Sequence, residues 1–260
     1  MKSRILGQMT PQYVRAYSEI LEDDPFDALS SVILSITRAL SDLLMPMCEY
    51  PRLIQQATKS PSAVSELAAK TAMAADRLYG INRHLILLCQ GISGSASEVD
   101  MDLLVRGILA DMAEQGNVPS PIRITLETDG QPARLHAPLD ALYHLVRDMC
   151  LNALASMPDG GQLTVRIGNV DIQDSDVAHG LGVPSAEYLC LQFVDTGPGI
   201  DENCNRTLFD PFVSTATGEG FGLGLCSVYR TILHFKGWIL YRPFSGSGAD
   251  FILFIPKEST

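Results

Sequence analysis

Apolar residues recur in the first third of the chain with the spacing of packed helices. From Leu29 they follow one another at alternating steps of four and three, and a second run of the same period begins at Val64. Such a repeat places one apolar seam along each helix. Helix-start signals stand at Asp24 and at Ser60, where a capping side chain comes directly before a proline. The pattern predicts a helical hairpin over residues 25–92.

One apolar seam on each of two helices buries too little surface to hold a hairpin together. Pairing of two copies in a dimeric four-helix bundle is the economical solution, so we expect a homodimer. A hairpin that packs against the rest of its own chain is the alternative. A Gly/Ser-rich stretch then predicts a linker over residues 93–100. The pattern indicates no role for residues 1–24.

Beyond the linker, helical and strand periods alternate through residues 101–257. The predicted helices are Met101–Gln115, Asp140–Met157 and Phe221–Phe235. The predicted strands are Ile122–Glu127, Gln162–Ile172, Tyr188–Asp195, Trp238–Arg242 and Asp250–Ile255. Helices mixed with mostly antiparallel strands indicate an α+β domain of two layers.

Composition narrows the classes of function. Of the 260 residues, 46% are hydrophobic and 19% charged, which suits a packed core. The formal net charge of -11 argues against general binding to nucleic acid or to an anionic membrane, because phosphate binding needs clustered cations. No secretory leader and no apolar run of membrane-spanning length is visible, so we expect a cytoplasmic protein.

The predicted helix over residues 140–157 carries a carboxylate and an amide four residues apart, Asp148 and Asn152. Residues at this spacing share one face of a helix. Oxygen ligands of these two kinds suit Mg²⁺ beside a phosphate. A polar helix face turned to water would show the same spacing.

Two glycine-containing segments follow. Asp195 ends a predicted strand and precedes Gly197 and Gly199, so its carboxylate is placed to accept a hydrogen bond from an exocyclic amine, although a simple turn has the same pattern. The run from Gly220 to Leu225 opens a predicted helix, where free N–H groups and the helix dipole suit a phosphate. A flexible loop is the alternative there.

Together and in this order, these clusters resemble the ATPase superfamily of gyrases, heat-shock chaperones, mismatch-repair proteins and histidine kinases. The resemblance implies the Bergerat fold, a two-layer α/β sandwich that binds ATP. It implies that Asn152 holds Mg²⁺ and that Asp195, with Gly197 and Gly199, reads the adenine amino group.

Two further boxes of the superfamily follow in the same order. The stretch from Leu208 to Phe212 is similar to the phenylalanine box, which implies a place for Phe212 at the ATP site. The second glycine box, which borders a mobile lid over ATP, is matched by Gly220, Gly222, Gly224 and Leu225.

The resemblance is closest to histidine kinases and covers residues 25–257. Residues 152–161 and 246–256 are similar to the catalytic domains of those kinases, and the hairpin is similar to their dimerisation and phosphotransfer domain. The hairpin departs from the family at the phosphoacceptor box, where the histidine is replaced by Arg38 and the following acidic residue by Ala39. Because arginine keeps its proton and has no lone pair to attack phosphorus, we expect no autophosphorylation at this position.

A second departure lies at Asp148, where histidine kinases usually carry asparagine. Other branches of the superfamily hold an acidic general base there, so Asp148 is a candidate base that activates water or a hydroxyl group. It is equally a candidate Mg²⁺ ligand, or a negative charge that weakens the binding of phosphates.

Three interpretations compete. The first is a degenerate histidine-kinase-like signalling protein that binds ATP–Mg²⁺ and regulates a two-component pathway by docking a response-regulator receiver domain or a partner kinase. The second is an active ATPase or serine/threonine protein kinase that uses Asp148 as general base. The third is a structural dimer with a vestigial nucleotide site.

Incubation with labelled ATP is expected to leave no phosphohistidine on the chain, because Arg38 occupies the acceptor position. The measurement is the acid stability of any label that stays on the purified protein. A phosphoryl group that acid removes would contradict the prediction.

Overall fold

The structure, a computed structural model, describes residues 14–16, 94–114, 121–172, 186–200, 223–243 and 248–257, with isolated positions between these ranges. The chain divides into two compact units, residues 1–19 together with 92–260, and residues 20–91. In the second unit the described positions are Thr71, Ala75, Leu78, Gly80, Asn82 and Ile86, and all of them are helical. The predicted four-helix bundle lies outside the described residues, and so do Arg38 and Ala39.

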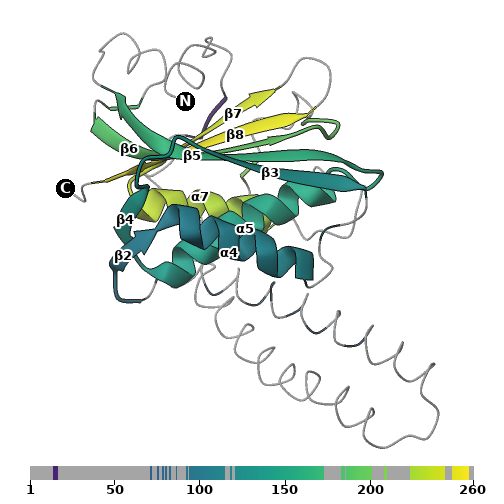
Figure 1. Cartoon of the computed structure of the whole chain (residues 1–260), viewed down its shortest axis with the longest axis horizontal. Coiled ribbons are helices and arrows are strands. Elements are labelled where there is room, and N and C mark those ends of the chain that lie inside the picture. The colour runs from purple at the N-terminus through teal and green to yellow at the C-terminus, as the bar shows by residue number, and fades with distance from the viewer. Residues whose placement is uncertain are drawn as a thin grey trace, which may run out of the picture. The chain divides into compact units, whose positions relative to one another are not determined.

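A six-stranded sheet forms the centre of the first unit, in the order β1-β7-β8-β6-β5-β3 (Figure 1). Its strands are β1 (Val14–Ala16), β3 (Ile122–Thr128), β5 (Gly161–Ile172), β6 (Ala186–Asp195), β7 (Trp238–Pro243) and β8 (Ala249–Pro256). β3 and β5 run parallel, and the other neighbours are antiparallel. The mostly antiparallel sheet predicted from the sequence is therefore confirmed in the described residues.

Three described helices lie on one face of this sheet (Figure 1). They are α4 (Met101–Glu114), α5 (Leu139–Ala155) and α7 (Gly224–His234). A small second sheet pairs β2 (Ser97–Asp100) with β4 (Arg134–Ala137). β2 occupies the last four residues of the predicted linker, and β4 is equally short, so neither produced a readable alternation in the sequence.

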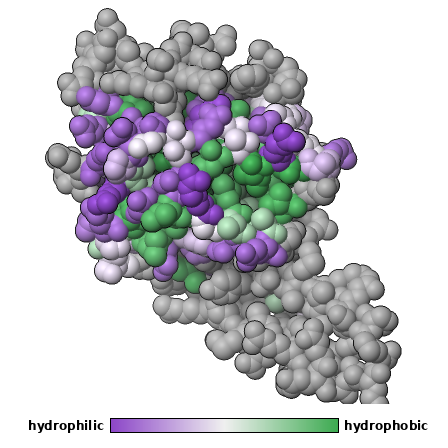
Figure 2. Space-filling view, viewed as in Figure 1, coloured by the Kyte–Doolittle hydropathy of each residue, from purple (hydrophilic) through white to green (hydrophobic). Residues whose placement is uncertain are grey.

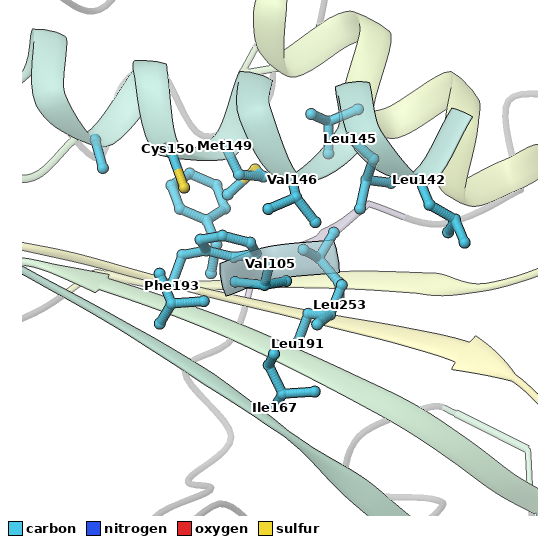
Figure 3. Packing of buried hydrophobic residues seen from close by; sticks show 14 of the residues in the cluster. Val105, Leu142, Leu145, Val146, Met149, Cys150, Ile167, Leu191, Phe193 and Leu253 are labelled. Carbon is cyan, nitrogen blue, oxygen red and sulfur yellow. The ribbon is translucent and has the colours of Figure 1, made fainter. Parts of the chain in front are cut away.

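The main core lies between α5 and the sheet. Leu142, Leu145, Val146 and Met149 point from α5 toward strand residues such as Phe193 (Figure 3). Their spacing of three and four residues is the one that gathers side chains on a single helix face. Each large apolar side chain buried here stabilises the fold by about 1.5–3 kcal/mol.

The opposite face of the sheet carries a second buried apolar cluster. It consists of Val170, Ile172, Val183, Tyr188, Cys190, Leu240, Ile252 and Phe254, with Trp238 packed against it. The ring of Tyr188 meets those of Trp238 and Phe254 edge to face, each at 5.8 Å between centroids. Strands with both faces buried read as continuous apolar runs. The predicted two-layer arrangement therefore accounts for only one face of the sheet.

The N-terminal segment contributes an edge strand that the sequence pattern did not predict. β1 pairs antiparallel with β7, with Val14 opposite Tyr241 and Ala16 opposite Ile239. Three residues are too few to show a strand period. The segment consequently belongs to the same compact unit as the strands near the C-terminus.

Figure 2 shows apolar surface mixed with polar side chains on the face where α4 lies in front. Among the described residues, the most exposed large hydrophobic side chain is Leu103 of α4, at 69%, followed by Leu139 at 49%. No helix in the described ranges is long and apolar enough to cross a membrane.

A substitution at Gly237, between α7 and β7, tests the packing of this unit. A Cβ there would clash with the carbonyl oxygen of Phe254 and approach Ile232 to 3.3 Å, whereas one at Gly107 on α4 would meet nothing within 4 Å. We expect Gly237→Ala to lower the free energy of unfolding by about 1–3 kcal/mol. The control, Gly107→Ala, should raise it by about 0.5–1 kcal/mol. Urea unfolding followed by circular dichroism checks both, and an unchanged Gly237→Ala variant would contradict the packing described.

Candidate nucleotide-binding site

Asp195 is the last residue of β6, and its side chain is buried. The oxygen Oδ1 accepts hydrogen bonds from the N–H groups of Gly197 at 2.9 Å and Ala249 at 3.1 Å. Within the described ranges, no donor of the protein binds the other oxygen, Oδ2. The carboxylate is thus fixed by the backbone through one oxygen and keeps the second for a ligand's donor, such as the amino group of adenine.

Three glycines let the backbone close around Asp195. A Cβ on Gly197 would lie 2.6 Å from Oγ of Ser156. Gly199 has a φ of 79°, and a Cβ there would lie 2.9 Å from the carbonyl oxygen of Gly248. Gly248, at a φ of 109°, would clash with the carbonyl oxygen of Asp195 if it carried a side chain. A side chain would therefore crowd the Ser156 hydroxyl at position 197 and the Gly248 backbone at position 199, where the positive φ also favours glycine.

Gly248 and Ala249 complete this arrangement, and the sequence did not mark them as site residues. The only signal was the resemblance of the segment 246–256 to the ends of histidine-kinase catalytic domains. Their role depends on β8 pairing with β6, a contact between residues far apart in the chain. Pairing of this kind cannot be read from local sequence patterns.

Burial controls the ionisation of Asp195. Removal from water raises the pKa of this carboxyl group, and the nearby charge of Asp250 raises it further. The hydrogen bonds from Gly197 and Ala249 lower the pKa, but the net direction is upward. Keeping the charge at this position therefore costs stability.

The end of α5 is joined to the end of β6. Thr196 accepts a hydrogen bond from the N–H of Gln162 at 2.9 Å, and its hydroxyl lies 3.6 Å from the sulfur of Met157. Ser156, the C-cap of α5, is the residue whose hydroxyl a Cβ on Gly197 would meet. Asn152, one turn earlier on α5, is half-buried. The segments that carry Asn152 and Asp195 thus belong to one connected structure.

Asp148 lies one turn before Asn152 and is buried at 6% exposure. The hydroxyl of Ser227 on α7 donates to Oδ2 of Asp148 at 3.4 Å. Asp148 therefore does not lie on a helix face turned to water, which was the alternative explanation of its spacing to Asn152. Its carboxylate faces the first turn of α7, and Ser227 is a neighbour that the sequence did not indicate.

The N-terminus of α7 suits an anion. The helix begins at Gly224, no side chain caps it at Leu223, and Leu225 is buried. Uncapped N–H groups at a helix start bind phosphate well. Phe209, within the predicted phenylalanine box, stacks on Tyr229 of the same helix at 5.2 Å between ring centroids. The predicted site residues Phe212, Gly220 and Gly222 lie outside the described ranges.

Residues 138–259 match the family described as histidine kinase-, DNA gyrase B- and HSP90-like ATPases. This stretch begins just before α5 and includes Asp148, Asn152, Asp195 and the start of α7. The chain therefore carries an ATPase domain of this superfamily. The curated relatives reported below are sensor kinases, which supports a histidine-kinase type catalytic core within this superfamily.

Two curated relatives illustrate the likeness. The chain is 34% identical over 122 residues to the sensor kinase CckA of Brucella abortus, covering 46% of this chain and 13% of CckA. It is 26% identical over 231 residues to the sensor protein kinase PmrB of Pseudomonas aeruginosa, covering 84% of this chain and 44% of PmrB. The chain thus spans less than half the length of either relative.

Solved structures share the fold. Full-length ShkA in complex with AMPPNP has a TM-score of 0.65 at 19% identity, covering 88% of this chain and 47% of ShkA. The histidine kinase ThkA, solved with the response regulator TrrA, has a TM-score of 0.58 at 16% identity, covering 94% of this chain and 68% of ThkA.

The raised pKa of Asp195 predicts how the free energy of unfolding depends on this carboxyl group and on pH. The raised pKa in the folded chain means that the charged carboxylate opposes folding at neutral pH, and this opposition fades as the pH falls through the raised value toward 3.8. Asp195→Asn keeps an oxygen that accepts both N–H bonds and removes the charge. We expect the variant to be more stable than the wild type at neutral pH.

Urea unfolding at neutral and at acid pH measures this difference. The advantage of Asp195→Asn should shrink as the medium becomes acidic, because the wild-type carboxyl group is then protonated in both states. A variant that is less stable by the same amount at both pH values would contradict the prediction.

Proposed function

We propose that this chain binds ATP with Mg²⁺ and regulates a two-component pathway as a degenerate histidine-kinase-like protein. It forms a homodimer through the hairpin over residues 25–92 and acts in the cytoplasm. It docks a response-regulator receiver domain or a partner kinase, and it does not phosphorylate itself at Arg38. The single observation that carries the nucleotide part is the buried Asp195, fixed through one oxygen with the other available.

Different residues of the site bind different parts of ATP–Mg²⁺. Asp195 accepts a hydrogen bond from the adenine amino group, and Gly197 and Gly199 let the backbone approach the base. The uncapped start of α7, at Gly224 and Leu225, binds phosphate, and the predicted glycine box with Gly220 and Gly222 extends this surface. Asn152 supplies an oxygen to Mg²⁺. The solved complex of ShkA with AMPPNP, which shares the fold, supports a nucleotide at this kind of domain.

The regulatory part rests on the hairpin sequence and on the relatives. CckA and PmrB are sensor kinases, and ThkA has been solved with a response regulator. A docking surface for a receiver domain does not require a phosphoacceptor. Replacement of the acceptor pair by Arg38 and Ala39 removes the nucleophile and leaves such a surface available.

Calorimetric titration with ATP–Mg²⁺ tests the nucleotide part. We expect the wild type to bind and Asp195→Asn to bind about 10- to 100-fold more weakly, since a hydrogen bond to a charged acceptor contributes about 1.5–3 kcal/mol. Asp111→Asn is the matched control, because Asp111 is exposed on α4. Absence of binding in the wild type at millimolar ATP would instead favour the structural dimer with a vestigial site.

A second candidate function is turnover of ATP, either as an ATPase or as a serine/threonine protein kinase. The observation that favours it is the burial of Asp148 against the first turn of α7, with Ser227 donating to its carboxylate. A carboxylate held beside a phosphate-binding helix start is placed to take a proton from an attacking hydroxyl group or water.

Phosphate release from ATP, measured with Asp148→Asn, decides between the two candidates. If Asp148 is the general base, turnover should fall about 10²- to 10⁴-fold while the Asp111→Asn control keeps the wild-type rate. Turnover that is the same in wild type and Asp148→Asn would remove the case for this function.

A further inference from the structure

The N-terminal strand β1 lies far from the candidate site in sequence, but it belongs to the same sheet, where β7 and β8 separate it from β6. Residues 1–19 belong to the same compact unit as residues 92–260, although residues 20–91 form a unit of their own. β1 pairs with β7 through three residues, Val14, Arg15 and Ala16, opposite Tyr241, Leu240 and Ile239. The hairpin unit is consequently connected to the ATPase unit at both of its ends.

Tyr241 links β7 to the loop that follows Asp195. Its side chain is fully buried and its ring lies 5.0 Å from that of Phe251 on the neighbouring strand. Its hydroxyl oxygen accepts a hydrogen bond from the N–H of Ile200 at 3.2 Å. Burial raises the pKa of this hydroxyl, so the group remains protonated and neutral.

The loop held by Tyr241 is the one that holds Asp195. Its near end is tied by the bond from the N–H of Gly197 to Oδ1 of Asp195. Its middle, at Gly199, lies against the backbone of Gly248 with no room for a side chain. Its far end is Ile200, fixed by Tyr241. Displacement of Tyr241 therefore frees one end of a loop whose other end positions the adenine-reading carboxylate.

β1 is a short strand at the edge of the sheet. A strand of three residues at the edge of a sheet opens more readily than central strands do. Without β1, strand β7 becomes the edge of the sheet.

We propose that β1 is a regulatory edge strand: its pairing with β7 holds Tyr241 and, through the hydroxyl of Tyr241, the loop from Gly197 to Ile200, so that nucleotide affinity depends on whether β1 is docked. This inference rests on the proposed nucleotide function. The occupant of the β7 edge is the chain's own segment 14–16. Because coupling between two binding events is reciprocal, ATP in turn stabilises the pairing of β1 with β7.

The test uses the full chain and variants that act on the backbone. Val14→Pro/Arg15→Pro removes two consecutive N–H groups. Since N–H groups of successive strand residues point to opposite sides, one of the two must face β7. The matched control is Val14→Thr/Arg15→Thr, which changes the same side chains and keeps a backbone that favours strands. Tyr241→Phe removes the hydroxyl alone.

Hydrogen exchange of the β7 and Ile200 amides, without nucleotide, is measured first. The proline variant should lose protection at β7 and at Ile200, and the threonine control should keep both. Tyr241→Phe should lose protection at Ile200 and keep it at β7. Affinity for ATP–Mg²⁺ should fall about fivefold or more in the proline variant and in Tyr241→Phe, with no further fall when the two are combined.

Two results would overturn the proposal. One is loss of protection at β7 with Ile200 as protected as in the wild type, which would show that the strand and the loop are independent. The other is unchanged protection at β7 in the proline variant, which would show that β1 is not docked in solution. A wild type that binds no ATP would refute the proposed function, and exchange at Ile200 would still decide whether β1 holds the loop.

Discussion

The buried carboxyl group of Asp195 at the end of β6 needs backbone N–H groups close by, because their hydrogen bonds counter the rise in its pKa that burial causes. That requirement brings the Gly197 and Ala249 amides onto one oxygen. It also requires glycine at 248, because any side chain there would meet the backbone of Asp195. The pKa of the Asp195 carboxyl group nevertheless remains above its ordinary value in the folded chain, so its ionisation costs free energy there. Buried carboxyl groups with a perturbed pKa are typical of functional sites.

The sheet order places the donors around this carboxylate. β6 lies between β5 and β8, so its last residue meets the start of each neighbour, Leu163 on one side and the segment at Asp250 on the other. The helices then add the remaining chemistry from one face of the sheet, with α5 carrying Asp148 and α7 contributing Ser227 and an uncapped N-terminus. The chain passes between its two units twice, from Glu19 to Ile20 and from Gly91 to Ile92.

Local patterns predicted the long elements well because each presents many residues to one core. The apolar spacing of α5 and the alternation or apolar runs of β5, β6 and β8 were readable without the fold. The three-residue β1 and the four-residue β2 and β4 were not, since three or four residues show too few alternations to identify a strand. At the site, Asp195 and its following glycines stood out in sequence, whereas Ala249, Ser227 and Tyr241 reach their partners only through strand pairing or helix packing.

The most direct test of the account compares two nucleotides on the unmodified chain. Inosine triphosphate carries a keto oxygen where ATP carries its amino group, so it offers Asp195 an acceptor in place of a donor. If Asp195 reads the adenine amino group, inosine triphosphate with Mg²⁺ should bind at least about tenfold more weakly than ATP in calorimetric titration. Equal affinity for the two nucleotides would contradict the assignment of Asp195 as the adenine-reading residue.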